Sequence, residues 1–372
     1  MNPTHGDDGK RILRVDLHAA IQQSRIGALH GLPFPVQFRR EGALDAWRKA
    51  LCATSDGVAI WQDWANAERT SYEIRQEILA YLHNYRNYAD ADPQAHTWQT
   101  VAKYWSQACS TNLLFELHKG TVIEATPALE TLLAHSDIDL ALPMSMVVPP
   151  FAAQYVRFGP EAGKLLPLLM PEQPDVAFDG VFCFLSTLPK DASGVVRGGW
   201  LELIFIVKVC GRFEGQVALS GSIDSGYATF NDWFRDCMAH SGAGLRSRPE
   251  VMSSFVSYVV KIFLYLTLKD ARRVSHAEFS EMQHRAKCVG PKKKARLAKK
   301  LATLYDGIVV GPATIPSTVR SVATSAHGVA PHWRRGHFRM QPHGQGKQLR
   351  KLIFVAPLLV HADRLSDEIP SP

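Results

Sequence analysis

The most constraining feature of this chain is the run Trp200 to Val209, WLELIFIVKV, in which most side chains are large and apolar or β-branched. Such a run predicts a β-strand, and its apolar density favours a central position in a sheet. Similar runs occur at Gln154 to Phe158, Gly180 to Leu185 and Gly215 to Ser220, separated by segments rich in proline and glycine. Together they predict an antiparallel sheet of about four or more strands.

Helical patterns precede this predicted sheet. Apolar residues recur at three- and four-residue spacing through residues 11–135, which predicts a helical region. Thr126 followed by Pro127 is typical of a helix start. The threonine side chain can accept a hydrogen bond from a free N–H group of the first turn, and proline has no N–H group that would require a partner there. Within the sheet, Glu202 and Lys208 share one strand face, which we expect to be exposed to solvent.

Helical patterns also follow the predicted sheet. Thr229 can cap a helix from Phe230 to His240, and Pro249 to Asp270 predicts a long buried helix. Its apolar run contains Lys261 and is too short to span a membrane. We therefore expect an α+β fold with three parts: a helical region (1–138), a body of sheet and helices (139–283), and a basic segment (284–372).

The whole chain has a net charge of +7, and its positive charge is concentrated in the last part of the sequence. Fifteen Lys or Arg and a single acid, Asp306, lie between Arg285 and Ala362, so this segment carries +14 and the remainder carries −7. Such asymmetry is typical of a nucleic-acid-binding segment attached to an acidic body. A helix expected from Lys292 to Tyr305 is basic on nearly every face, although a solvated surface explains its lysines equally well.

Residues 332–346, HWRRGHFRMQPHGQG, hold three histidines, three arginines and two aromatics without a carboxylate. We expect a loop, tied to a strand formed by the apolar run Leu352 to Val360 in spite of Pro357. Arginines that fork onto phosphates and aromatics that stack on unpaired bases suit RNA. The expected nucleic-acid contacts are Arg334, Arg335, Arg339, Trp333, Phe338, Lys347, Lys292, Lys293, Lys294 and Arg296, and the expected turn residues are Gly336, Gly344 and Gly346.

Two histidines of this segment, His332 and His337, are candidate catalytic residues. They flank two arginines, and a metal-free ribonuclease needs only a general base, a general acid and a cation on the phosphate, because RNA supplies its own 2′-hydroxyl nucleophile. The alternative is that both histidines hydrogen-bond the backbone and stiffen a binding loop. The residues leave open whether the protein is an enzyme. The histidine spacings match no standard zinc pattern, and we expect no metal or other cofactor.

The pattern Pro331-His332-x-Arg334-Arg335-Gly336-His337-aromatic, then Gly344-x-Gly346 and a strand containing Pro357, resembles the type V-A anti-CRISPR family conventionally numbered two, with its phage and plasmid homologues. The resemblance implies a mobile-element protein that recognises the nascent N-terminal peptide of a CRISPR effector and causes loss of the translated message. The chain departs from the family after His337, where a tryptophan-rich run is replaced by Phe338 to His343. We therefore expect that its target can differ.

These observations predict a protein of the bacterial cytoplasm, because the N-terminus lacks a signal-peptide core and no segment is suited to a membrane. The resemblance implies that the body (139–283) binds a nascent peptide or a protein, and that the basic segment engages RNA or the ribosome and promotes translation-coupled mRNA degradation. Two alternatives remain: a non-enzymatic adaptor that recruits host ribonucleases, and a phage or plasmid DNA-binding regulator. The residues do not predict an oligomeric state.

Overall fold

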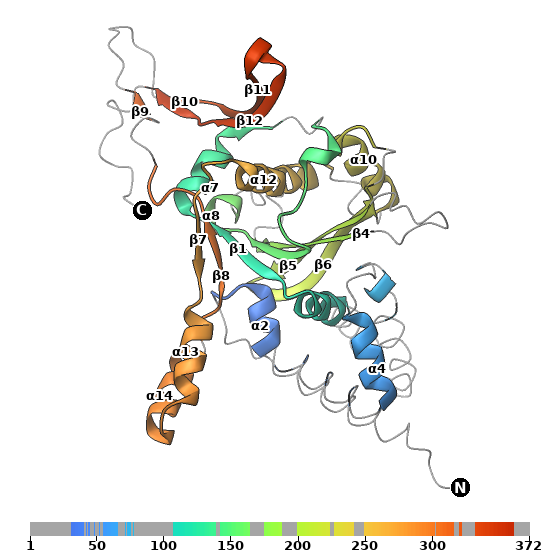
Figure 1. Ribbon diagram of the computed structural model, residues 1–372, viewed down its shortest axis with the longest axis vertical. Coiled ribbons are helices and arrows are strands. Elements are labelled where there is room, and N and C mark those ends of the chain that lie inside the picture. Colours follow the sequence, from blue (N-terminus) through green and yellow to red (C-terminus); the bar gives the residue numbers. More distant parts are fainter. Residues whose placement is uncertain are drawn as a thin grey trace.

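A computed structural model shows how these elements are arranged (Figure 1). It describes residues 31–40, 55–65, 107–138, 142–163, 175–187, 199–223, 227–241, 249–301, 303–315, 320–321 and 332–360, together with Gly42, Leu44, Arg48, Cys52, Ser71, Glu73, Ile74, Arg75 and Glu77. Much of the predicted N-terminal helical region, including residues 11–30 and 78–106, lies outside these residues.

The centre of the molecule is a seven-stranded sheet in the order β6-β5-β4-β3-β1-β8-β7. Its strands are β1 (Thr121–Ala125), β3 (Ala153–Arg157), β4 (Val176–Thr187), β5 (Gly199–Val209), β6 (Arg212–Ser222), β7 (Arg273–His276) and β8 (Gly307–Val310). The antiparallel β3-β4-β5-β6 portion confirms the predicted sheet. The WLELIFIVKV run forms β5, but this strand lies second from the edge and not at the centre.

Strand β1 was not predicted, because residues 11–135 were expected to be helical. It lies parallel to both β3 and β8, which makes the sheet mixed. Its five residues, TVIEA, are too few to show a periodicity and are followed at once by a helix. Strands from all three predicted parts of the chain therefore lie in one sheet.

Both faces of the sheet are covered. On one face, α10 (Phe230–His240) and α12 (Pro249–Thr267) pack with α7 (Pro127–Ala134) and α8 (Pro160–Gly163) into a large apolar cluster (Figure 1). On the other, α2 (Phe34–Arg40) and helical residues 107–117 form a second cluster, with α4 (Ser55–Trp64) nearby (Figure 1). Successive residues of β5 therefore pack into opposite apolar clusters: Leu203 into the first and Ile204 into the second.

Two predicted helix starts are confirmed. Thr126 accepts a hydrogen bond from the backbone N–H of Leu129, and proline occupies the first turn of α7. Thr229 forms a capping box with Asp232 at the start of α10. Among the described residues α12 is the one helix long and apolar enough to cross a membrane, but 67% of its most apolar window is buried in the fold. It is a core helix, as predicted.

The expectation that Glu202 and Lys208 form an exposed face is wrong. The Glu202 side chain is fully buried and forms an ion pair with Arg75, whose Nη1 lies 2.8 Å from Glu202 Oε1. The N-terminal helices cover this face, and strand alternation alone cannot indicate which faces of a sheet are covered. Lys208 is also mostly buried and forms an ion pair with Asp179 at 2.5 Å.

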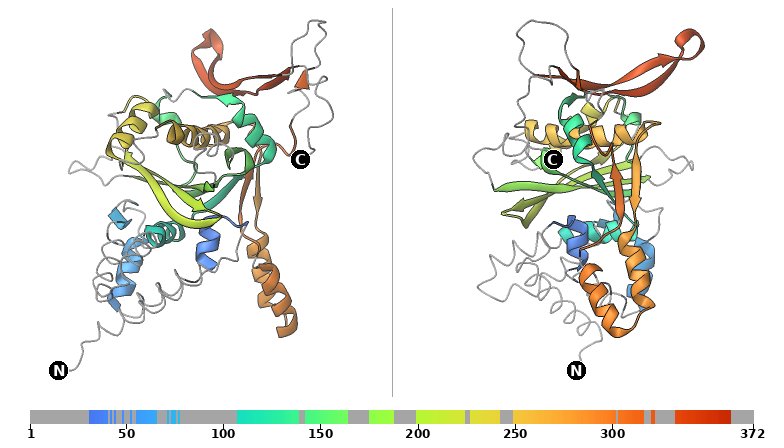
Figure 2. Two further views of the ribbon diagram at one scale, coloured as in Figure 1. Left: turned by 180° about the vertical axis from the view of Figure 1, so that it is seen from behind. Right: turned by 90° about the vertical axis from the view of Figure 1, so that its left-hand side faces the viewer.

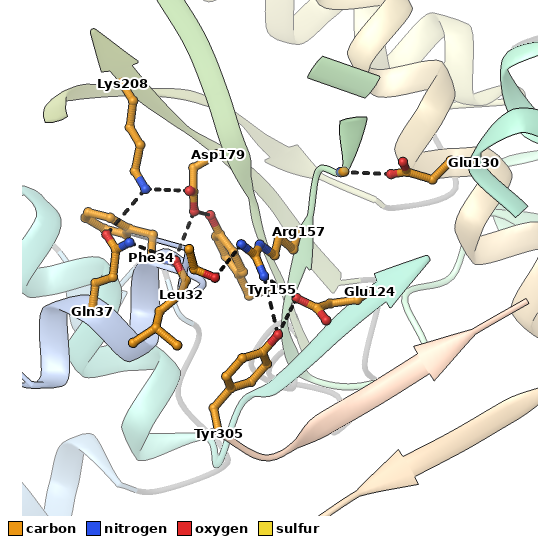
Figure 3. Close-up of polar contacts among 12 residues, drawn as sticks. Leu32, Phe34, Gln37, Glu124, Glu130, Tyr155, Arg157, Asp179, Lys208 and Tyr305 are labelled. Atoms are coloured by element: carbon orange, nitrogen blue, oxygen red, sulfur yellow. Dashed lines mark hydrogen bonds and ion pairs between the residues drawn. The ribbon is translucent and has the colours of Figure 1, made fainter. Parts of the chain in front are cut away.

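Asp179 binds the start of α2 to the face of the sheet that carries the second apolar cluster (Figure 3). The register between β4 and β5 shifts across this residue, so Asp179 is the extra residue of a β-bulge. Its carboxylate accepts hydrogen bonds from the backbone N–H of Phe34 at 3.0 Å and from the Tyr155 hydroxyl at 2.5 Å. Burial, followed by the adjacent Asp179 charge, raises the pKa of Tyr155 well above its usual value, so the tyrosine remains the donor.

Two basic structures project from opposite ends of the long axis, and the three views agree on this arrangement (Figures 1 and 2). At one end, α13 (Glu278–Lys287) and α14 (Pro291–Leu301) form a helical hairpin. At the other lies the β-structure formed by residues 332–360. The predicted basic segment is therefore divided between two surfaces, separated by β7 and β8.

The burial of the Arg75–Glu202 pair predicts a large effect of removing one partner. Glu202→Gln leaves the buried guanidinium without its counter-charge, and we expect a loss of about 3–5 kcal/mol in the free energy of unfolding. Arg235→Gln, which breaks the exposed pair with Asp232, is the control and should cost under about 1 kcal/mol. Urea denaturation measures both. Equal urea midpoints for Glu202→Gln and wild type would contradict a buried ion pair between Arg75 and Glu202.

Candidate functional site

Residues 332–360 form a β-ribbon, and the expectation of a loop at residues 332–346 is therefore wrong. Strands β10 (His332–Arg334) and β11 (Gly336–His343) pair with β13 (Leu358–Val360) and β12 (Leu349–Val355), respectively. The pairings His332 with Val360 and His337 with Val355 share one register, so the two halves form one interrupted antiparallel ribbon. A basic composition does not distinguish a loop from a projecting ribbon, because both expose many side chains to solvent.

The ribbon is interrupted at Gly336 and Pro357. Proline has no N–H to donate, so the predicted Leu352 to Val360 strand divides into β12 and β13 at this point. Gly336, expected to be a turn residue, instead begins β11 and pairs with Ser136 of β2 (Ser136–Asp137). A Cβ atom here would lie 2.6 Å from both Pro357 N and Ser136 Oγ, so the glycine permits close packing of two chain segments.

The two aromatic residues expected to stack on bases are already stacked within the protein. Trp333 lies against His135, with ring centroids 4.4 Å apart and an interplanar angle of 12°. Phe338 stacks on Phe354 at 4.7 Å and packs against the first apolar cluster. Both rings therefore attach the ribbon to the body, which is a sufficient reason for aromatics at these positions.

Most polar residues of residues 332–346, the motif, are exposed. His332, Arg334, His337 and Arg339 alternate with the half-buried aromatics and face solvent. Since the same register continues on both sides of the interruption, the chain is extended between His332 and His337, and their Cα atoms lie roughly 15 Å apart. Each histidine is therefore better placed to contact its own phosphate than to share one phosphate as an acid–base pair.

At its tip the ribbon turns through η3 (Gln345–Lys347), a short 3-10 helix. Gly344 and Gly346 have φ values of 78° and 66°, in the region that glycine adopts without strain. Lys347 is exposed beside them, and Arg350 and Lys351 follow on the returning strand. The tip therefore carries positive charge away from the body (Figure 2).

The helical hairpin α13–α14 carries the predicted lysines. Lys292, Lys293, Lys294 and Arg296 are all exposed, and α14 has no fully buried residue among those described. The acids of α13, Glu278 and Glu281, lie in its first turn near the base, so the far end of the hairpin is purely basic.

Both ends of this hairpin are fixed at its base. Asp306, the single acid between Arg285 and Ala362, accepts hydrogen bonds from the N–H groups of Phe279 and Ser280 at the start of α13. Arg40 of α2 donates to the carbonyls of Leu301 and Leu304 where α14 ends. The sequence showed that Asp306 is isolated among basic residues but not that it caps a helix 27 residues away.

Tyr305 continues this attachment to the sheet (Figure 3). Its hydroxyl donates to Glu124 of β1 at 2.6 Å, and Glu124 forms an ion pair with Arg157 of β3 at 2.8 Å. Burial, followed by the hydrogen bond to Glu124, raises the pKa of Tyr305, so it is protonated at physiological pH. The basic hairpin is therefore held at a defined orientation.

A cleft of about 430 Å³ lies beside the motif and was not predicted. It is bounded by the end of α7, β2, α12 and the first part of the ribbon. Its polar lining includes Ser136, Asp137, Ser253, Ser257, Lys261 and Arg335. Lys261, which the sequence analysis noted only as an interruption of an apolar run, donates hydrogen bonds to the carbonyls of Leu133 and Ser136.

Two charged groups face Lys261 in the cleft: Asp137 of β2 and Arg335 of the motif. Burial lowers the pKa of Lys261 to about 8, while Asp137 opposes this shift and Arg335 adds to it. No group of three or more His, Cys, Asp or Glu among the described residues, in the cleft or outside it, is arranged to hold a metal ion.

The lowered pKa of Lys261 predicts a specific pH dependence of stability. Between pH 8 and its usual pKa of 10.5, the unfolded chain holds a proton that the folded protein has released, so rising pH favours folding through this group. The free energy of unfolding of wild type relative to Lys261→Met should therefore grow between pH 8 and 10, by up to about 1.4 kcal/mol per pH unit. Urea denaturation of both proteins measures the difference, and a constant difference over this range would contradict the prediction.

The match to a family model agrees with the resemblance noted in the sequence. The model of the AcrVA2-like family, described as the anti-CRISPR type V subtype A2 family, matches residues 123–362, which include the sheet, the cleft and the ribbon. A crystal structure of AcrVA2 is similar over 85% of this chain and 98% of that chain, with 11% identity and a TM-score of 0.40. No curated protein matches the chain. On the strength of the family match, the chain belongs to the AcrVA2-like family of type V subtype A2 anti-CRISPR proteins.

Proposed function

We propose that this anti-CRISPR protein recognises the nascent N-terminal peptide of a target protein, such as a CRISPR effector, and promotes degradation of the mRNA being translated. It acts on translating ribosomes in the cytoplasm of the bacterial host. The observation that carries the RNA part of this proposal is the pair of basic projections at opposite ends of the molecule (Figures 1 and 2).

The charges on these projections suit a long polyanion. Lys292, Lys293, Lys294 and Arg296 on the helical hairpin, and Arg334, Arg335, Arg339 and Lys347 on the ribbon, are exposed. Lysine and arginine side chains that contact phosphates release counterions, which supplies affinity without regard to sequence. Because Asp306 and Arg40 fix the base of the hairpin, its charges are held in place before RNA binds.

A second candidate is a non-enzymatic adaptor that recruits host ribonucleases. The separation of roughly 15 Å between the Cα atoms of His332 and His337, along an extended strand, favours this candidate over intrinsic cleavage. In a metal-free ribonuclease both groups must reach the reacting oxygens of one phosphodiester. A DNA-binding regulator has no comparable observation in its favour.

A cleavage assay distinguishes the two candidates. Purified wild type and His332→Ala/His337→Ala would be incubated with ribosomes translating a type V-A effector message, with and without EDTA, and then with added host extract. We expect both proteins to bind ribosomes and to cause message loss only when extract is present. Cleavage by wild type in EDTA without extract, lost in the double variant, would instead establish a metal-free ribonuclease.

The RNA-binding role of the helical hairpin has its own test. Lys292→Gln/Lys293→Gln/Lys294→Gln removes three charges, and we expect the slope of log affinity against log salt for RNA or ribosomes to decrease by about 2–3. The matched control, with arginine at the same three positions, keeps the charges and should bind as wild type does. An unchanged slope in the glutamine variant would show that the hairpin does not contact RNA.

A further inference from the structure

The cleft beside the motif has the composition of a site for an anionic group. Two cations, Lys261 and Arg335, line it together with one acid, Asp137, so its charged side chains sum to +1 when Lys261 is protonated. Two of the three Lys261 protons are donated to backbone carbonyls, which leaves one N–H for a ligand. A protonated amine in this position is poorly compensated by its surroundings.

Neutral hydrogen-bond donors complete the lining. Ser253, Ser257 and Lys261 follow one another at intervals of four residues and so lie along one side of α12, an otherwise largely apolar helix. The hydroxyls of Ser253 and Ser257 make no hydrogen bond within the part of the chain that the structure describes, whereas Ser254 donates to the carbonyl of Glu250. Two hydroxyls are therefore available to a ligand in the cleft.

Arg335 can exchange its present partner for a ligand. Its ion pair with Asp137, at 3.1 Å, is exposed on both sides, with 63% of the arginine and 67% of the aspartate side chain accessible. Exposed pairs of this kind stabilise a protein little, so transfer of the guanidinium to a phosphate loses little. A guanidinium also binds two oxygens of a phosphate at once.

The surroundings of the cleft favour phosphate over an isolated carboxylate. The adjoining ribbon exposes His332, Arg334, His337 and Arg339, and the stretch from His332 to Gly346 contains no acid. A chain with a regular series of negative charges can occupy the cleft and the ribbon together. Apolar walls from Leu133, Ile138 and Ala162 leave room beside the charged groups for a sugar or base.

We propose that this cleft binds one phosphate group of an RNA strand, held by Arg335, Lys261 and the hydroxyls of Ser253 and Ser257, with the strand continuing past exposed cations of the adjoining ribbon. This inference rests on the proposed function, since it assigns the RNA contact of the motif to a defined pocket. Arg335 then differs from the other motif arginines: it contacts RNA inside a cleft, whereas Arg334 does so on an open surface.

The test measures binding of a fluorescent octauridylate to the full chain as a function of salt. Ser257→Leu fills the cleft without changing the charge of the protein, and we expect about tenfold weaker binding and a salt slope reduced by about 1. Thr131→Leu, a similar neutral change on α7 outside the cleft, should bind as wild type. A neutral substitution lowers the salt slope only if phosphate contacts are lost, so an unchanged slope in Ser257→Leu would overturn the proposal.

Arg335→Gln and Arg334→Gln, each measured alone and combined with Ser257→Leu, supply a second measurement, which tests whether the effects are additive. Both remove one exposed charge from neighbouring positions. We expect Ser257→Leu to add little to Arg335→Gln, because both remove the same contact, and to add its full effect to Arg334→Gln. Full additivity in both double variants would contradict a shared phosphate site.

Competition experiments separate the possible ligands. Inorganic phosphate should displace octauridylate from wild type at lower concentration than from Ser257→Leu. Displacement by a glutamate-rich peptide but not by phosphate would overturn the proposal in favour of an acidic peptide. Wild type that fails to bind octauridylate even at low salt would contradict the proposed RNA function itself, whereas normal RNA binding by every cleft variant would contradict only the cleft assignment.

Discussion

A carboxylate in a strand that is buried on both faces requires a counter-charge, and Glu202 of β5 obtains it from Arg75. Without this ion pair the second face of the sheet would contain an uncompensated charge next to Ile204 and Ile206. The pair therefore links the N-terminal helical region to the sheet. A second buried carboxylate nearby is also compensated: Asp179, in the β-bulge, forms an ion pair with Lys208 and accepts a hydrogen bond from the start of α2. Polar contacts thus determine where the N-terminal helices attach, and apolar packing fills the remaining volume.

The sequence predicted those features that depend on neighbouring residues. The caps at Thr126 and Thr229 are local hydrogen bonds, and the four antiparallel strands are long enough to show their composition. Features that depend on distant residues were not predictable in this way. Lys208 resembles a solvated residue until its partner Asp179 is known, and β1 is recognisable as a strand only through its neighbours β3 and β8.

The motif illustrates the same limit at the candidate site. Its residues carry the resemblance to the anti-CRISPR family, and the family match includes them. Its conformation differs from the expected loop, because the segment that pairs with it lies beyond a glycine turn and is interrupted at Pro357. Trp333 and Phe338 were expected to face a ligand, yet the contacts with His135 and Phe354 that occupy them involve residues outside the motif.

The interruption at Gly336 explains why the motif has this form. Ser136 of β2 and Pro357 approach Gly336 so closely that a Cβ atom would be excluded. Gly336 N donates to the carbonyl of His135, and Lys261 donates to the carbonyls of Leu133 and Ser136 on either side of it. Residues 133–137 therefore form hydrogen bonds with both the ribbon and the buried Lys261. Arg335 precedes the glycine and consequently lies at the cleft, so the position of the charge follows from the packing requirement of its neighbour.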